Sequence, residues 1–411
     1  MPELTYQHGV RIEPVPDGNI SLTVVDQATV GIIGTAPAAD NAKFPLNTPI
    51  GITGDADQLT ALGATGTLRD QINNLIAASG GTYIPKVAIV RVTEGADAEA
   101  TIANMVGAAG SMTGWHAFKG ARSELGFKPK IYMAPGFTGQ RIDDAANPLV
   151  TAMVPWLERQ RARMVVGGPG TTKEDAIEYR DDFGSMVLDI VDPRVIAPDP
   201  DTGINAVQPA EAFVIGLGVR IIRAGDADSK KPAGFWVSWS NAEVGAMVNT
   251  ERRISFDMLD PDTESHLLNE NRINTFVREK GWRFWGGLSA SSDDNWMFSN
   301  VVRTRFAIEE MIAEGFKPII DAPMTAPAVV EAISSLDDKL LDFKEAGAIL
   351  GGKAFFLPGQ NSNGQLRAGK LRVEFDAEET PPIHALSIGS RRNIKYFDVL
   401  VDDIVRELGA A

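Results

Sequence analysis

Leu268-Asn-Glu-Asn-Arg-Ile-Asn274 and Gly281-Trp-Arg-Phe-Trp-Gly286, followed by a long run to Phe316, form the stretch in which aromatic residues are most concentrated. Trp282, Phe284 and Trp285 fall within four residues of one another. Aromatic side chains bury more area than other side chains and dominate cores and interfaces. We therefore expect this stretch to anchor a domain, with core packing as its first role and a subunit interface as its second.

The rest of this stretch predicts a long helix. Asp294 is the expected N-cap, and Gly315 ends the pattern. Apolar residues recur between them at spacings of three and four, as in an amphipathic helix: Phe298, Val301, Val302, Ile308, Met311 and Ile312. The stretch holds neither a nucleophile beside a base nor a cluster of metal ligands, so we interpret it as structural.

Length and composition restrict the class of protein. The 411 residues allow about two or three domains. We find no apolar run long enough to cross a membrane and no secretory signal, so we expect no membrane insertion. The absence of cysteine excludes disulfides and thiolate chemistry and fits folding in a reducing cytoplasm. A net charge of −15 argues against binding to nucleic acid or to an anionic membrane surface.

Strands and helices alternate through the first half of the chain, which predicts α/β layers. The expected strands are 30–34, 86–92, 130–134, 163–166 and 186–191, and the expected helices are 55–62, 68–78, 98–108, 113–124, 144–160, 172–180 and 209–223. Residues 192–206 contain three prolines and three aspartates, which indicates an exposed connection.

The C-terminal part predicts a mixed arrangement of helices and strands. Thr325 is expected to cap a helix over 327–345, with strands at 355–357, 371–376 and 383–388. Its charged face includes Glu331, Asp337, Asp338 and Lys339. Residues 396–408 have the spacing of an amphipathic helix. The fold class is therefore α/β and α+β, with an α/β layered domain and a C-terminal mixed domain.

Motifs that could carry chemistry have better structural explanations. Gly167-Gly-Pro-Gly-Thr-Thr-Lys173 resembles a phosphate loop, but two threonines separate its last glycine from the lysine, so a strand-to-helix turn with an N-cap explains it better. Gly216 and Gly218 lie in a predicted helix, where close helix packing accounts for them. The four histidines, His8, His116, His266 and His384, are scattered. The pair Asp293-Asp294 suits a helix N-terminus. We predict no catalytic, cofactor or metal site.

Several of these motifs, in consistent order, resemble contractile-tail sheath proteins of bacteriophages and R-type bacteriocins. They are Gly9–Glu13 with Thr29–Ala36, the loop Phe44–Pro49, Leu268-Asn-Glu270 with Ile273, Gly281–Gly286 and Phe298–Thr304. The chain departs from the pattern at Gly287-Leu-Ser289, where the family has Asn-Arg-Thr.

The resemblance implies a domain order and two terminal arms. It places an N-terminal arm at 1–20, an N-terminal core part at 21–96, an α/β middle domain at 97–265, a C-terminal sheath domain at 266–390 and a C-terminal arm at 391–411. It implies arm strands at Val10, Arg11, Ile12 and Glu13, and at Ile394 and Tyr396, where the residue pattern alone favours a helix. Glu331, Asp337, Asp338 and Lys339 become candidates for facing a tail tube.

The implied function is structural. Sheath subunits polymerise as helically stacked hexameric rings around a tail tube and contract to drive it through the bacterial envelope for genome ejection. The implied partners are other copies of the chain, the tube protein, and baseplate and tail terminator proteins, in a virion tail assembled in the host cytoplasm. Two alternatives stay open: the sheath of a bacteriocin or another injection machine, and a soluble α/β enzyme, which the alternating strands and glycine-rich turns would also fit.

Overall fold

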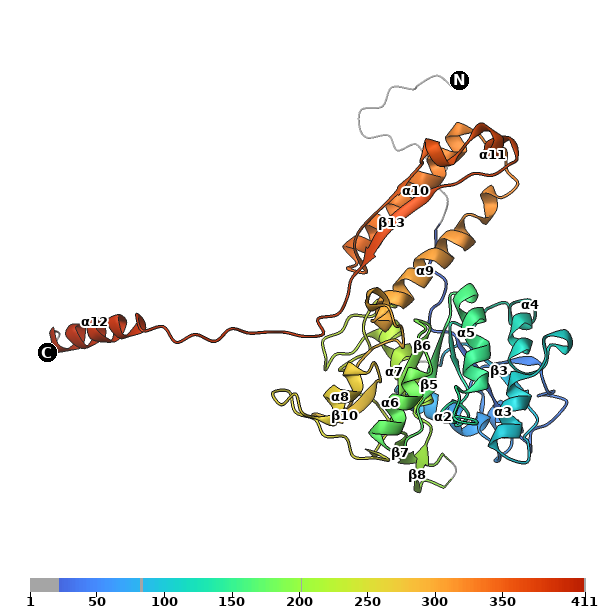
Figure 1. Ribbon diagram of the computed structural model, residues 1–411, viewed down its shortest axis with the longest axis horizontal. Helices are drawn as coiled ribbons and strands as arrows, with labels where there is room; N and C mark the ends of the chain where they lie inside the picture. Colours follow the sequence, from blue (N-terminus) through green and yellow to red (C-terminus); the bar gives the residue numbers. More distant parts are fainter. Residues whose placement is uncertain (1–21, 82–83, 201, 410–411) are drawn as a thin grey trace, which may run out of the picture. The chain divides into compact units, whose positions relative to one another are not determined.

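The computed structural model describes residues 22–81, 84–200 and 202–409 and divides into two units between Pro381 and Pro382. The larger unit contains an α/β body and, at the end of helix α9, a lobe made of helix α10 and a β-hairpin (Figure 1). The predicted fold class, α/β together with α+β, is confirmed. The body's sheet takes strands from both sides of residue 96, and the finer domain boundaries stay a prediction.

The α/β body is built on one six-stranded sheet in the order β2-β3-β1-β4-β5-β6. Its strands are β1 (Val30–Thr35), β2 (Pro49–Ile52), β3 (Val87–Val92), β4 (Ile131–Met133), β5 (Arg163–Gly167) and β6 (Leu188–Val191). All neighbours pair in parallel except β2, which is antiparallel to β3. Five of these strands were predicted from apolar runs. Parallel strands are buried on both faces, so they form such runs.

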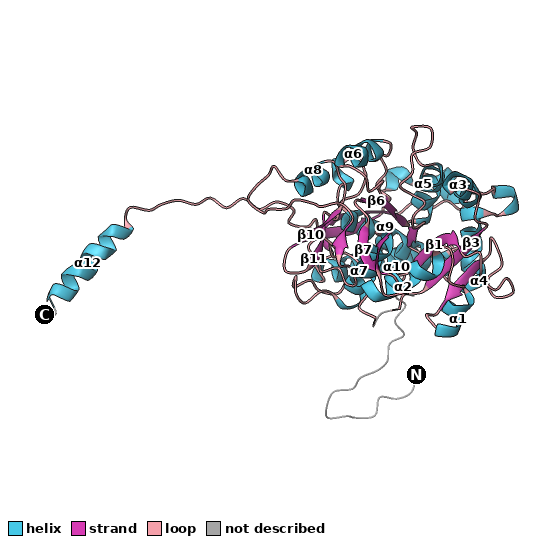
Figure 2. Ribbon diagram, turned by 90° about the horizontal axis from the view of Figure 1, so that it is seen from below, coloured by secondary structure: helices cyan, strands magenta, loops and turns pink. Residues whose placement is uncertain are grey.

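Helices cover both faces of the sheet (Figure 2). Val30 and Ile32 of β1 lie in one core with α2 (Leu68–Ala78) and α7 (Glu211–Ala224), whereas Ile33 lies in the opposite core with α3 (Ala98–Val106), α5 (Pro148–Gln160) and α6 (Lys173–Asp181). Successive side chains of a strand point to opposite faces, so one strand serves both cores. No helix among the described residues is both long and apolar enough to cross a bilayer.

The two glycines of α7 are explained by helix packing, as predicted. A Cβ at Gly216 would lie 2.5 Å from the carbonyl oxygen of Leu75 in α2, and one at Gly218 would lie 2.3 Å from the ring of Trp239. Both distances are far below a van der Waals contact. Only glycine lets α7 approach its neighbours this closely.

Residues 192–206 do not form the exposed connection predicted for them. They contain β7 (Val195–Pro198) and the start of β8 (Asn205–Gln208), which form a three-stranded antiparallel sheet with β9 (Asn249–Thr250) in the order β8-β7-β9. Val195 is fully buried. The prediction failed because β7 gains its third strand from residues far along the chain, and local proline and aspartate content does not show such a contact.

The aromatic stretch forms a hairpin followed by the long helix. β10 (Thr275–Arg278) pairs with β11 (Trp282–Trp285), and Phe276 and Phe284 are buried in the main core. Helix α9 (Ser299–Gly315) follows, but Asp294 is not its N-cap. Phe298 occupies that position, and Asp293 instead caps a short 3₁₀ helix by accepting from the amide of Asn295 at 2.9 Å. A turn of 3₁₀ helix thus replaces the predicted first turn.

The C-terminal elements differ from the prediction mainly at their ends. Helix α10 (Ala326–Glu345) begins at its predicted cap, Thr325. The hairpin strands are β12 (Ile349–Phe355) and β13 (Glu374–Glu379), displaced from the predicted 355–357 and 371–376. Residues 383–388 are not a strand, although their pattern predicted one. The remaining helices are α1 (Ala56–Ala61), α4 (Ala121–Leu125), α8 (Glu264–Glu270), α11 (Asn363–Arg367) and α12 (Tyr396–Gly409).

Candidate assembly interface

The lobe is a two-stranded ribbon packed on one long helix. β12 and β13 pair antiparallel, with a register shift between Ile349 and Gly351. Its core contains buried side chains of α10 and β12, namely Leu336, Leu340, Phe343, Ile349 and Ala354, which cluster with Leu22, with Phe235 and with Ala307, Ile308 and Met311 of α9. The Asp337 carboxylate of α10 also accepts from the backbone amide of Ala354 at 2.5 Å. This side-chain bond fixes the helix along the ribbon.

The ribbon is also tied to helix α9. Arg305 forms an ion pair with Glu379 at 2.7 Å and donates to the carbonyl of Ala377 at 2.6 Å. Its guanidinium lies over the ring of Phe375 at 5.6 Å. The amide of Asn300 reaches the carbonyl of Thr380 at 3.1 Å. These contacts hold the C-terminal end of β13 beside α9.

Both long edges of the ribbon lack a neighbouring strand among the described residues, because the sheet contains β12 and β13 only. A strand edge presents a row of backbone donors and acceptors that another chain can pair with. The ribbon can therefore accept an added strand on each side, which is the chemistry of β-augmentation.

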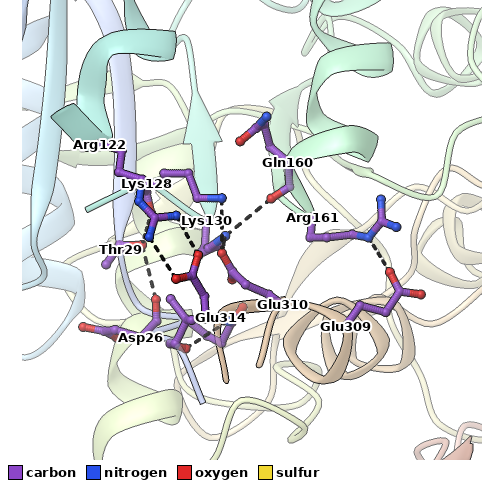
Figure 3. A network of polar contacts seen from close by, with 12 residues as sticks. Asp26, Thr29, Arg122, Lys128, Lys130, Gln160, Arg161, Glu309, Glu310 and Glu314 are labelled. Atoms are coloured by element: carbon purple, nitrogen blue, oxygen red, sulfur yellow. Dashed lines mark hydrogen bonds and ion pairs between the residues drawn. The ribbon is translucent and has the colours of Figure 1, made fainter. Parts of the chain in front are cut away.

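Helix α9 is fixed to the sheet of the body by charged side chains (Figure 3). Glu310 pairs with Lys130 beside β4, and both side chains are almost completely buried, at 5% and 2% exposure. One turn later, Glu314 accepts two bonds from Arg122, at 2.6 and 2.9 Å. Glu309 pairs with Arg161 on the other side of the helix. We call these residues the α9 clamp.

In the α9 clamp, burial and ion pairing shift the pKa of Lys130 in opposite directions. Burial lowers the pKa of Lys130, and the neighbouring Glu310 acts to raise it. The bonds from Arg122 and Lys317 lower the pKa of Glu314 to about 2. Lys130 and Glu310 stabilise each other as a pair because either charge alone would be buried without compensation.

Arg303 is a further buried cation on α9, and sequence reasoning did not identify it. It donates to the carbonyls of Phe235 and Val237 and lies over the ring of Trp239 at 4.4 Å. Burial lowers its pKa to about 9. Arg303 and Glu310 are seven residues apart and so share the apolar face of the helix, which was an available signal. These contacts bind the aromatic segment 235–239 to the helix that carries the lobe.

Residues 382–411 form the second unit. No strand or helix is present from 382 to 395, and α12 follows. The predicted amphipathic helix at 396–408 is therefore confirmed. Apolar side chains of this unit are exposed, for example Ile383 at 86%, Ile388 at 81% and Leu408 at 75%.

The predicted arm residues fall in different parts of the structure. Val10, Arg11, Ile12 and Glu13 lie outside the described residues. Ile394 lies in a turn and Tyr396 begins α12, so neither has strand conformation in the single chain. Their role between subunits stays a prediction.

The four tube-facing candidates all lie on α10 but not in equivalent environments. Asp338 is exposed, and Glu331 is half-buried. Lys339 pairs with Asp342 at 2.9 Å. Asp337 faces β12 through its bond to Ala354. The tube-facing role stays a prediction for all four, and Asp338 is the most accessible of them.

The glycine-rich loop after β5 borders a cavity of about 120 Å³. Glu211 lies against it, fully buried, and accepts from the hydroxyl of Thr138 at 3.1 Å. Asp192 accepts from the amide of Gly170 at 2.7 Å. Thr172 caps α6 by accepting from Asp175 N at 3.1 Å, as the strand-to-helix reading predicted. The carboxylates here hold loops in place.

We predicted no metal site. Among the described residues, no group of three or more histidine, aspartate or glutamate side chains is placed so that it could hold a metal ion. Burial lowers the pKa of His116 and that of His384. The Nε2 of His266 contacts the carbonyl of Asp257 at 3.0 Å. His8 lies outside the described residues.

Comparison with known proteins identifies relatives along almost the whole chain. It is 28% identical over 409 residues to the tail sheath protein of Escherichia phage P2, covering 97% of this chain and 98% of that protein. It is 29% identical over 379 residues to a putative prophage major tail sheath protein of Pseudomonas aeruginosa, covering 92% and 94%. No protein-family model matches the chain.

Solved structures show the same fold. The contracted helical sheath of the anti-feeding prophage superposes with a TM-score of 0.67 at 15% identity, covering 95% of this chain and 100% of that one. The contracted sheath of the extracellular contractile injection system called PVC gives 0.66, covering 96% and 99%. The resemblance to contractile-tail sheath proteins is therefore confirmed.

Proposed function

We propose that this chain is the sheath subunit of a contractile tail and transforms no small molecule. It would polymerise as helically stacked hexameric rings around a tail tube and contract to drive the tube through the bacterial envelope for genome ejection. The observation that carries this proposal is similarity to a phage tail sheath protein over 97% of the chain and 98% of that relative.

The lobe and the terminal segments supply a physical route to assembly. Neither long edge of the β12–β13 ribbon has a strand partner among the described residues, and residues 383–388, which were predicted as a strand, have none there either. Each added backbone hydrogen bond contributes about 0.5–1.5 kcal/mol net, so one short strand is a moderate tether and many are a strong one. Donation from copy to copy is a heterologous contact, which grows as a helix where its rotation does not close.

Contraction then requires rigid bodies joined by tethers. The α9 clamp and Arg303 hold each α/β body to its lobe, while strand tethers keep neighbouring copies connected as the bodies move. The extended array would be held by a kinetic barrier, and contraction would exchange it for larger contacts between bodies. The work comes from these contacts, so no nucleotide is required.

The proposed partners are further copies of the chain, the tail tube protein, and the baseplate and tail terminator proteins. Nucleic acid is not among them, in keeping with a net charge of −15, and neither is the membrane interior. The proposed location is the virion tail, assembled in the host cytoplasm.

The second candidate is the sheath of an R-type bacteriocin or of another contractile injection machine. Its support is the similar fold of two solved sheath structures, those of the anti-feeding prophage and of the extracellular contractile injection system PVC. Electron microscopy of particles from the source cell decides between them. Tails attached to DNA-filled capsids support the phage proposal, and tails without capsids support the second candidate.

Negative-stain electron microscopy of the purified chain tests assembly itself. We expect tubular polymers, and a strictly monomeric protein at high concentration would contradict the proposal. A chain lacking residues 1–20 should remain folded but no longer polymerise. The deletion must stop before Leu22, which packs in the lobe core. Normal polymers from the truncated chain would refute strand donation by the N-terminal segment.

The tube-facing prediction needs a variant that spares the lobe. Asp338→Lys changes an exposed side chain, whereas Asp337→Lys also removes the bond to Ala354. We expect Asp338→Lys to weaken co-sedimentation with tail tubes without lowering the melting temperature. Unchanged co-sedimentation would remove Asp338 from the tube-facing surface.

A further inference from the structure

The cavity beside the glycine-rich loop, which we call the Glu211 cavity, lies where the ends of three parallel strands meet. Among the residues that line it, Gly136 and Gln140 follow β4, Gly168 follows β5 and Arg194 follows β6. In open α/β sheets, ligands bind outside the carboxyl ends of the strands. The volume of about 120 Å³ is several times the roughly 10–15 Å³ that one water needs. The Glu211 cavity therefore has the position and the size of a site for a small ligand.

Glu211 contributes a buried carboxyl group to this cavity. It is the first residue of α7, it lines the cavity, and it is only 1% exposed. No lysine or arginine among the described residues forms an ion pair with it. Buried charges in proteins are normally paired or bind a cation, because an uncompensated charge is costly away from water. The described chain therefore supplies no counter-charge for the ionised form of Glu211.

Burial and hydrogen bonding shift the pKa of Glu211 in opposite directions. Burial raises it, whereas bonds from the hydroxyl of Thr138 and from the backbone amides of Gly136 and Gly167 act to lower it. The N-terminus of the 14-residue helix α7 also favours a negative charge at this position. These neutral donors hold the carboxylate in place without cancelling its charge, so a cation in the cavity would find it already oriented.

Gln140 contributes a second acceptor to the cavity lining. Its Nε2 donates to the carbonyl of Gly136 at 2.7 Å. This bond fixes which way round the amide lies, because a carbonyl can only accept. The Oε1 of Gln140 is buried and has no hydrogen-bond partner among the described residues. A buried acceptor without a donor is costly, so a ligand that donates a hydrogen bond here would be stabilised.

The rest of the lining favours a cation over an anion. Arg194 is the one basic residue of the lining among the described residues, and its guanidinium forms two bonds of 2.7 Å to Glu251. Its charge is therefore already compensated. Gly136 and Arg194 are exposed, so a ligand can reach the cavity from solvent. Such a ligand meets a carboxylate and an amide oxygen, and both of these groups accept hydrogen bonds.

We propose that the Glu211 cavity binds a small cation that donates hydrogen bonds, namely an ammonium or guanidinium group. Its N–H groups bond to the carboxylate of Glu211 and to the Oε1 of Gln140. A metal ion suits the site less, because no group of three or more acidic or histidine ligands surrounds it in the described chain. The cation can be free in solution or can end a lysine or arginine side chain of another copy, because both sources carry the same chemistry.

Calorimetric titrations and melting curves of the dilute full-length chain test the site. The probes are methylammonium chloride and guanidinium chloride, used far below denaturing concentrations. Sodium chloride and tetramethylammonium chloride are the controls, because the tetramethylammonium ion has the same charge but no N–H group. We expect the two probes to raise the melting temperature by roughly 1–3 °C at about ten times their Kd, and the controls to have no such effect. Equal effects of all four salts, or no binding of either probe, would overturn the proposal.

Substitutions then locate the site. Glu211→Gln keeps the shape of the side chain but removes its charge, and the affinity for methylammonium should fall roughly tenfold or more because a charge-assisted bond is lost. Glu174→Gln makes the same charge change at an exposed carboxylate of α6 and should leave the affinity unchanged. If Glu211→Gln does not fold, Gln140→Leu removes the second acceptor at a half-buried position and should also weaken binding. An affinity that these cavity variants leave unchanged, or that Glu174→Gln lowers equally, would refute the assignment.

Titration of the polymer distinguishes the two sources of the cation. If the natural ligand is a free cation, methylammonium should bind the polymer and the dilute chain alike. If a side chain of another copy fills the Glu211 cavity, binding should be lost when the chain polymerises. The result is separable from the proposed function. A chain that polymerises but binds neither probe refutes this inference alone, whereas a chain that binds them and never polymerises refutes the sheath proposal alone.

Discussion

Replacing Glu310 by glutamine is expected to destabilise the protein far more than replacing its neighbour Glu309. The exposed fractions of Glu310 and Lys130 are 5% and 2%, so Glu310→Gln leaves a buried ammonium without its anion. Removing one partner of a buried pair costs about 3–5 kcal/mol. Glu309 and Arg161 are 31% and 42% exposed, and such pairs contribute about 0.2–1 kcal/mol.

Urea unfolding followed by circular dichroism and tryptophan fluorescence measures the difference. Both variants lose one negative charge on adjacent positions of the same helix, so Glu309→Gln is a matched control. A double variant, Lys130→Met with Glu310→Leu, should recover part of the loss because no buried charge remains. If Glu310→Gln is no more destabilising than Glu309→Gln, the buried pair does not fix α9 to the sheet.

Three further predictions concern the same packing. Arg303→Lys should lower the free energy of unfolding by about 1–3 kcal/mol in urea melts, because a lysine cannot serve both carbonyls and a buried acceptor is left unpaired. An unchanged stability would refute this role. Gly218→Ala should cost about 1–3 kcal/mol by overpacking against Trp239, whereas Gly359→Ala, with open space around it, should be neutral. Equal melting temperatures for the two variants would contradict the packing argument. The pKa of Glu314 is lowered to about 2 from 4.5, so its contribution is present above the unfolded pKa and is lost as pH falls through about 2. The stability difference between the natural chain and Glu314→Gln should therefore shrink between pH 4.5 and pH 2, and a constant difference would exclude the shift.

Sequence patterns predicted the helices and strands whose determining residues are close together in the sequence. The buried strand β3 (Val87–Val92) is a largely apolar run, and α10 has its cap at Thr325 and its apolar stripe within one segment. The pattern at 396–408 likewise predicted α12. In each case the residues that define the element are neighbours in sequence, so periodicity alone carries the information.

The predictions that failed concern elements whose structural partners lie far away in the sequence. Strand β7 pairs with β9 at residues 249–250, so the prolines and aspartates of segment 192–206 misled the prediction. Residues 383–388 were predicted as a strand but have no strand partner among the described residues. The buried charges of Lys130, which precedes β4, and Glu310 in α9 are 180 residues apart in the sequence. A pattern can indicate that a segment suits a strand, but only the fold or the assembly supplies its partner.

The open edges of the β12–β13 ribbon have a consequence for length control. If every copy receives strands from some neighbours and gives them to others, a finite stack has two unlike ends. In the ring at one end, the β12–β13 edges have no further copy to supply a strand. In the ring at the other end, the terminal strands have no further ribbon to pair with. Each end therefore requires a stop of its own kind: a strand mimic at the first and a ribbon mimic at the second.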